Sequence, residues 1–268
     1  MEEAQPYSSF AADVASTALG VSRRITVVMP QDMPVVARVP VLYLNDGQNL
    51  FDPSRAFAGV TWRAAETVAT LAGHGIIPPI AVVGIDHGEL RRAREYLPVE
   101  DERNPFAREP LAIEYGRFVT DELMPFVEAE FPVARGASNT AFGGSSYGAV
   151  SALFTVMSHP GTFGRLLLES PSLYVGGGVL LKRVRRVQRW PQRVYLGVGT
   201  AETQRADWNS ETVANVTRLE KVFRDAGLGP RRLRVIVEPG ASHSEGAWAG
   251  RFAHALQFLF GQPPRRGR

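Results

Sequence analysis

The stretch "NTAFGGSSYGAVSALF", residues 139–154, places two adjacent serines among glycines, where a strand-like run meets a helix-like run. Within it, Gly144-Ser145-Ser146-Tyr147-Gly148 fits G-x-S-x-G, the pattern of a nucleophilic serine on a sharp turn between a strand and a helix. The glycines let the backbone turn tightly and let neighbouring segments approach. The turn puts the hydroxyl at the amino end of a helix, where the dipole favours developing negative charge. Ser146 is the predicted nucleophile, because Ser145 has tyrosine rather than glycine two residues later.

Short apolar runs alternate with longer helical patterns on both sides of this stretch. The predicted strands are 23–29, 39–45, 80–85, 139–144, 165–170, 193–199 and 231–238, with a run around 11–16 as an antiparallel edge. The predicted helices are 61–73, 113–131, 147–158, 178–190, 211–226 and 245–260, and Pro125 should kink the second or begin its second half. Apolar runs without alternation are typical of strands covered on both faces. The pattern predicts an α/β fold, a mostly parallel sheet with helices on both faces, in a single domain of residues 1–268.

One charged connection, residues 86–110, is longer than the usual loop of a compact domain. Two interpretations stay open. Such a segment can act as a lid or a substrate loop, or it can be a surface excursion held by ion pairs.

The composition argues against several classes of protein. An apolar content of 44% and a charged content of 21% are ordinary for a soluble globular protein, and no apolar run approaches the ~20 residues that cross a bilayer. A net charge of +3 gives little support to nucleic-acid binding. Cysteine is absent, and no two of the five histidines have the i, i+4 spacing of a helical zinc site, so no metal or other cofactor is expected. The N-terminal segment lacks the pattern of a secretory signal, which predicts a cytoplasmic location.

A serine nucleophile needs a base, and the base needs a group that orients it. His243, in "EPGASHSEGAW", lies in a loop between the last strand run and the last helix, whereas the other four histidines precede the serine or belong to helices and their ends. The acid has three candidates at strand ends. Glu202 in "LGVGTAET" ranks first, Glu169 in "LLLESPS" second and Glu238 third.

Acyl transfer also needs donors for the oxyanion. One is the backbone N–H of Tyr147, directly after the nucleophile. The other is expected from the loop Asp46-Gly47-Gln48-Asn49 after "VLYLN", with Gln48 as the donor. The alternative is an ordinary turn that ends a strand.

Together these stretches resemble the putative esterase family of the α/β-hydrolases, which includes enterochelin esterases, bacterial feruloyl esterases, esterase D and the mycolyltransferases. The matching stretches span nearly the whole chain: "VLYLNDGQNLFD" (41–52), "VVGID" (82–86), "RAREYLP" (92–98), "DELMPFVEAEFP" (121–132), "FGGSSYGAVSAL" (142–153), "SPSLY" (170–174), "GVGTAET" (197–203) and "GASHSEGAW" (240–248).

The resemblance implies an α/β-hydrolase fold with Ser146 as nucleophile, His243 as base and Glu202 as acid. It also implies that an arginine and an acid–tyrosine pair in 92–98 hold a loop over the site. For Arg94 the alternative is a contact with substrate. Tyr174 and Trp208 are expected to line the pocket, or else to be core aromatics.

The predicted function is therefore hydrolysis of a small-molecule carboxylic ester through an acyl-enzyme intermediate. An acyltransferase or a siderophore trilactone esterase could use the same three residues, the latter with loop arginines near a ferric catecholate. A hypothesis of a different class is a binding module that keeps the fold without catalysis.

Overall fold

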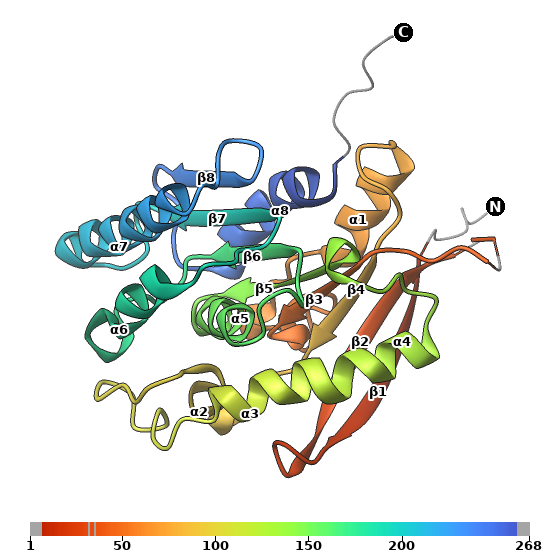
Figure 1. Cartoon of the computed structure of the whole chain (residues 1–268), viewed down its shortest axis with the longest axis horizontal. Helices are drawn as coiled ribbons and strands as arrows, with labels where there is room; N and C mark the ends of the chain where they lie inside the picture. The colour runs from red at the N-terminus through yellow and green to blue at the C-terminus, as the bar shows by residue number, and fades with distance from the viewer. Residues whose placement is uncertain (1–6, 32, 35, 262–268) are drawn as a thin grey trace, which may run out of the picture.

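The computed structural model describes residues 7–31, 33–34 and 36–261. Its eight strands form one sheet with the order β1-β2-β4-β3-β5-β6-β7-β8 (Figure 1). The strands are β1 (Tyr7–Ser16), β2 (Val21–Pro30), β3 (Val41–Asn45), β4 (Ala81–Ile85), β5 (Thr140–Ser145), β6 (Arg165–Glu169), β7 (Arg193–Gly199) and β8 (Leu233–Glu238). β1 pairs antiparallel with β2, and β2 with β4, while the strands from β4 to β8 run parallel. The predicted α/β fold and its antiparallel edge are confirmed.

The sheet is covered on both faces, which explains the apolar strands without alternation. Leu42 and Leu44 of β3 point into a core shared with α1 and α8, whereas Val41 and Tyr43 point into a core shared with α3, α5 and α7. The α-helices are α1 (Ala64–Gly73), α2 (Arg92–Tyr96), α3 (Ala112–Arg117), α4 (Met124–Glu130), α5 (Tyr147–Ser158), α6 (Val175–Arg183), α7 (Ala206–Asp225) and α8 (Glu245–Phe260). Since both faces of the central strands are buried, open space for chemistry lies at the strand ends.

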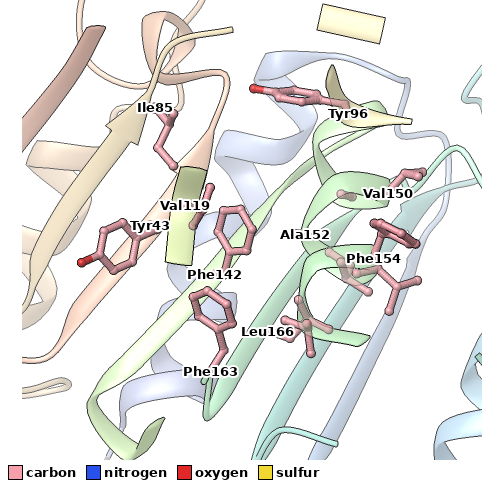
Figure 2. Packing of buried hydrophobic residues seen from close by; sticks show 14 of the residues in the cluster. Tyr43, Ile85, Tyr96, Val119, Phe142, Val150, Ala152, Phe154, Phe163 and Leu166 are labelled. Atoms are coloured by element: carbon pink, nitrogen blue, oxygen red, sulfur yellow. The ribbon is translucent and has the colours of Figure 1, made fainter. Parts of the chain in front are cut away.

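The core under α5 fixes the position of that helix. Figure 2 shows Phe142 of β5 and Leu166 of β6 packed toward Val150 and Ala152 of α5, and the rings of Phe142 and Phe163 stack with centroids 5.2 Å apart. Packing at interior density leaves little freedom for a helix to shift on its sheet. The residue that joins β5 to α5, Ser146, is therefore held at a defined place.

The helix predicted over 113–131 is one continuous rod in three parts (Figure 1). Between α3 and α4 lies a π-helical segment, Phe118–Leu123, and Pro125 is the second residue of α4. A π-helical turn widens the helix just before the residue that has no N–H to donate. Pro125 thus begins the second half of the helix, one of the two predicted outcomes.

The predicted bounds of several elements differ from the observed ones. The predicted helix 178–190 is α6 followed by a short 3₁₀ turn, Val184–Arg186, and three residues within α6, Gly176, Gly177 and Gly178, have left-handed backbone angles. The segment 86–110 contains a 3₁₀ turn, Glu89–Arg91, and α2. Ion pairs join this segment internally, to β2 and to Asp46 directly after β3. A role as a lid or substrate loop stays a prediction.

Candidate active site

Ser146 occupies a strained turn between β5 and α5. Its backbone angles are φ 55° and ψ −123°, a region that residues with a side chain rarely adopt. Its N–H donates to the carbonyl of Glu169 in β6 over 2.9 Å, which holds the turn against the neighbouring strand. The side chain is half-buried, and its Oγ lies 3.3 Å from Oγ of Ser172. The G-x-S-x-G pattern therefore marks a real backbone constraint.

The two glycines of the pattern are required by close contacts. A Cβ at Gly144 would lie 2.9 Å from the carbonyl carbon of Gly148, and a Cβ at Gly148 would lie 2.8 Å from Oδ2 of Asp46. Asn45 reinforces this approach because its Nδ2 donates to the carbonyl of Gly148 over 2.7 Å. The start of α5 thus lies directly against the end of β3.

His243 and Glu202 form an acid–base pair in which the carboxylate is buried and the imidazole is partly exposed. His243 Nδ1 lies 2.6 Å from Oε2 of Glu202, whose side chain is 1% exposed, while the imidazole is 33% exposed. With the proton on Nδ1 shared with the carboxylate, Nε2 keeps a lone pair and can accept a proton. The ring edge of Trp248 packs on the imidazole with centroids 4.9 Å apart.

The other oxygen of Glu202 is held equally firmly. Its Oε1 accepts the hydroxyl of Ser170 over 2.7 Å and the N–H of Gly199 over 2.6 Å. Burial by itself raises the pKa of this carboxyl, but the hydrogen bonds from His243, Ser170 and Gly199 outweigh burial and hold the pKa below its ordinary value. Glu202 is therefore ionised at neutral pH.

The alternative acids have a different partner. Glu169 Oε2 accepts Nε and Nη2 of Arg251 over 2.9 and 2.8 Å, and Glu238 accepts Nη1 of the same guanidinium over 2.6 Å. Burial raises the pKa of Glu169 to about 7, although Arg251 opposes the rise. Among the described residues, neither carboxylate bonds to His243, so the geometry favours Glu202.

The expected oxyanion loop lies beside the start of α5. Residues Gly47–Asn49 form a 3₁₀ turn after β3, and Asp46 before them adopts a left-handed conformation, φ 59° and ψ 47°. The side-chain oxygen of Gln48 accepts the N–H of His87 over 3.1 Å, which ties this turn to the residue two positions after β4. Since the Asp46 carboxylate lies close to Gly148, this turn lies close to the start of α5, where Tyr147 is the first residue.

Arg92 holds that loop in place. Its Nε and Nη2 donate to the two carboxylate oxygens of Asp46 over 2.6 and 2.9 Å, and the guanidinium lies 5.6 Å from the ring centre of Tyr147. The Tyr96 hydroxyl accepts the N–H of Asp46 over 3.2 Å. The segment 92–98 therefore does contain an arginine and a tyrosine that hold a loop, but the arginine is Arg92.

A cavity of about 440 Å³ opens beside the acid–base pair. Its lining includes His243, Glu202, Ser170, Ser172, Tyr174 and Trp208. Arg103, which sequence reasoning missed, also lines it and lies 4.1 Å over the ring of Tyr174. Arg94 does not line this cavity, because its guanidinium pairs with Glu109 at the surface. A larger hollow of about 1290 Å³ between β8 and α8 shares no lining residue with this cavity; Glu238 and Arg251 lie on its wall.

Ser172 and Ser170 were also missed, although "SPSLY" lies within a stretch that carries the family resemblance. Their signal was the position of this stretch at the end of a predicted strand.

In residues 7–31, 33–34 and 36–261, no cluster of three histidine, aspartate or glutamate side chains could hold a metal ion. Over the same ranges, no helix is both long and apolar enough to cross a bilayer.

Comparison with known proteins gives the family. Residues 16–259 match the family described as "Putative esterase". The chain belongs to this family. Since the match covers most of the sequence, the protein is a serine esterase, a carboxylic-ester hydrolase of α/β-hydrolase fold, as predicted.

Relatives of this esterase span a range of coverage. The uncharacterized protein YbbA of Bacillus subtilis is 20% identical over 248 residues, 90% of this chain and 94% of the relative. The iron(III) salmochelin esterase of Escherichia coli O6:H1 is 28% identical over 157 residues, 58% of this chain but 33% of that enzyme. Among solved structures, the enterobactin esterase FES of Shigella flexneri has a TM-score of 0.72 at 21% identity, with 96% of this chain and 60% of that one covered. The BES protein of Bacillus cereus has a TM-score of 0.73 at 18% identity, with 98% of this chain and 97% of that one covered. These structures share the fold, and this chain spans about three fifths of the Shigella enzyme.

Proposed function

We propose that this esterase cleaves carboxylic esters in two steps through an acyl-enzyme formed on Ser146. The observation that carries the proposal is the 2.6 Å contact of His243 with Glu202, on the wall of a cavity that also contains Ser172, the neighbour of Ser146. In the described structure, Ser146 Oγ is not hydrogen-bonded to His243. Contacts between nucleophile and base are commonly loose before substrate binds and tighten in the complex.

The mechanism follows from the groups in place. Nε2 of His243 takes the hydroxyl proton of Ser146 as Oγ attacks the ester carbonyl carbon. The oxyanion accepts hydrogen bonds from the N–H groups of Tyr147 and Gln48. His243 gives this proton to the leaving alkoxide as the ester C–O bond breaks. The same imidazole then deprotonates a water that attacks the acyl carbon, and returns that proton to Ser146 Oγ as the Oγ–acyl bond breaks and the acid leaves. Glu202 keeps Nδ1 protonated and stabilises the imidazolium in both steps.

Replacement of the nucleophile tests the mechanism. Ser146→Ala should lower kcat for a short p-nitrophenyl ester by on the order of 10⁴-fold or more. The matched control is Ser145→Ala, since Ser145 is the adjacent serine, buried at the end of β5. A fluorophosphonate probe should label wild type and Ser145→Ala but not Ser146→Ala. Retained turnover in Ser146→Ala would contradict the mechanism, and an unreactive wild type would favour a binding module.

Hydrolysis of a siderophore trilactone is the second candidate. It is favoured by the likeness to proteins named salmochelin and enterobactin esterases and by Arg103 on the cavity wall. A cationic side chain stacked on a tyrosine can face an anionic aromatic group. Turnover of a ferric catecholate trilactone with higher kcat/KM than p-nitrophenyl esters would select this candidate, and an alcohol or sugar acceptor that accelerates acyl release would instead indicate an acyltransferase.

A further inference from the structure

A second hollow of about 530 Å³ adjoins the catalytic cavity. Tyr174, Glu211 and Asn215 line both spaces, so the two hollows lie side by side at these residues. We call the two together the groove; its lining extends from His243 to residues of α6 and α7. A substrate larger than a short ester would have room to extend beyond the reacting bond along this groove.

An unusual run of backbone forms part of the wall of the second hollow. Gly176, Gly177 and Gly178 have φ values of 56°, 65° and 72°, a conformation that residues with side chains rarely adopt. At Gly176 a Cβ would lie 2.5 Å from Val99, so the segment 86–110 packs against the run on one side. At Gly177, by contrast, a Cβ would meet nothing within 4 Å. The chain thus lines the second hollow there with bare backbone.

The far end of the groove is positively charged. Lys182 and Arg185, from α6 and the turn after it, line the second hollow together with Arg218 of α7. Arg218 is already paired with Glu211 over 2.9 Å. Lys182 and Arg185 are exposed and, within the described part of the chain, form no ion pair or side-chain hydrogen bond. Two uncompensated cations therefore remain where the groove ends.

We propose that this groove selects esters that carry a carboxylate at the end remote from the ester bond. The reacting carbonyl lies near Ser146, the chain of the substrate passes Tyr174 and the glycine run, and the carboxylate lies among Lys182, Arg185 and Arg218. This inference rests on the proposed function, because it assigns a substrate class to the same nucleophile. Exposed ion pairs are individually weak and are screened by salt, so the preference should be moderate and should shrink as ionic strength rises.

The test compares charged esters with neutral partners of equal length. One pair has the charge on the acid side: the p-nitrophenyl monoester of suberic acid and its methyl-capped diester. The other has it on the alcohol side: butyrate esters of a long hydroxy acid and of its methyl ester. In at least one pair, wild type should give a kcat/KM for the charged ester about three- to tenfold above the neutral one. The double variant Lys182→Gln/Arg185→Gln should remove this preference and leave turnover of the neutral ester unchanged.

The same helix offers a matched control. Arg183→Gln/Arg186→Gln removes the same charge from exposed positions that do not line the groove, and should keep the preference. Equal kcat/KM values within both pairs, or equal losses in the two double variants, would overturn the inference. If either result is found, loss of neutral-ester turnover in Ser146→Ala would show that the proposed function holds although the inference about the groove fails.

Discussion

At the scale of single residues, the site depends on a chain of hydrogen bonds behind the imidazole. Trp248 Nε1 donates to Ser170 Oγ over 2.9 Å, and Ser170 in turn donates to Glu202, which accepts from His243. Each member has its partner, so the carboxylate is fixed in both position and charge. A change of charge at Glu202 should therefore act on the chemical step rather than on substrate binding.

Substitution of each carboxylate in turn tests whether Glu202 or Glu169 is the acid that orients His243. Glu202→Gln presents an amide to Nδ1 and favours the wrong imidazole tautomer, so kcat should fall by about 10²- to 10⁴-fold with little change in KM. Glu169→Gln alters the buried pair with Arg251 and should change stability while kcat per folded molecule stays at the wild-type value. Steady-state kinetics with active-site titration makes the comparison, and the reverse order of effects would assign the acid to Glu169.

Arg92 provides a second prediction at this scale. Arg92→Lys loses the two-pronged contact with Asp46, so the loop that carries Gln48 should loosen and kcat should fall by about tenfold while KM changes little. The control is Arg108→Lys, an exposed arginine of the same segment whose partner, Glu100, is also exposed. It should stay within about twofold of wild type, because exposed pairs contribute little. A parallel loss in both variants would show that the segment, rather than the Asp46 contact, matters.

The residues that the sequence predicts best are those under local constraint. Ser146 needs glycines on both sides and a strand-to-helix turn, and all of these lie within a few neighbouring positions. Arg103 reaches the cavity only through folding of a segment far from Ser146, so no spacing in the chain indicates it, and Ser172 is indicated only by its place after a predicted strand. The choice of Arg94 in place of Arg92 has the same origin: the two stand two residues apart on α2, and only the packed loop decides which of them meets Asp46.

At the scale of elements, the join of β5 to α5 tolerates little added volume. Gly148→Ala would bring a methyl group to 2.8 Å from the Asp46 carboxylate and 3.1 Å from the Cβ of Asn45. Either the helix or the Asp46 carboxylate, which Arg92 holds, must shift. The free energy of unfolding should therefore fall by about 1–3 kcal/mol, and kcat should fall with it because both adjoin the turn that carries Ser146. Urea unfolding and ester turnover measure the two effects.

A helical glycine in open space supplies the control for that change. At Gly250 in α8, an added Cβ meets nothing within 4 Å, so Gly250→Ala should raise the free energy of unfolding by about 0.5–1 kcal/mol through helix propensity alone. Equal effects of the two alanines would contradict the argument from close packing at the elbow.

Element boundaries were less predictable than element types. Periodicity predicts a helix over 113–131. The π-helical turn before Pro125 depends on how the widened turn packs against the rest of the fold, which periodicity does not encode. Likewise α7 begins at Ala206, five residues before its predicted start, since Asp207 and Trp208 carry no apolar periodicity although they extend the helix beside the cavity.

At the scale of the whole molecule, Glu245 joins three distant parts of the chain. At the first residue of α8, its Oε1 accepts Nδ2 of Asn49 over 2.9 Å and its Oε2 accepts Nε1 of Trp62 over 2.5 Å. It thereby ties the helix after His243 to the loop after β3 and to the segment just before α1. Burial raises the pKa of this carboxyl to about 7, although the bonds from Trp62 and Asn49 oppose the rise.

The last prediction concerns the pH dependence of folding. A carboxyl with a folded pKa of about 7 and an ordinary unfolded pKa binds more protons in the folded state between those values, so stability falls as pH rises through this window and levels off above it. Urea midpoints of wild type should therefore drop relative to those of Glu245→Gln from about pH 5 to about pH 8, because the amide cannot titrate. His87, whose pKa burial lowers, contributes the opposite slope, but it is present in both proteins and cancels in the difference. A wild-type midpoint that rises relative to the variant over this range would show that Glu245 folds in its charged form.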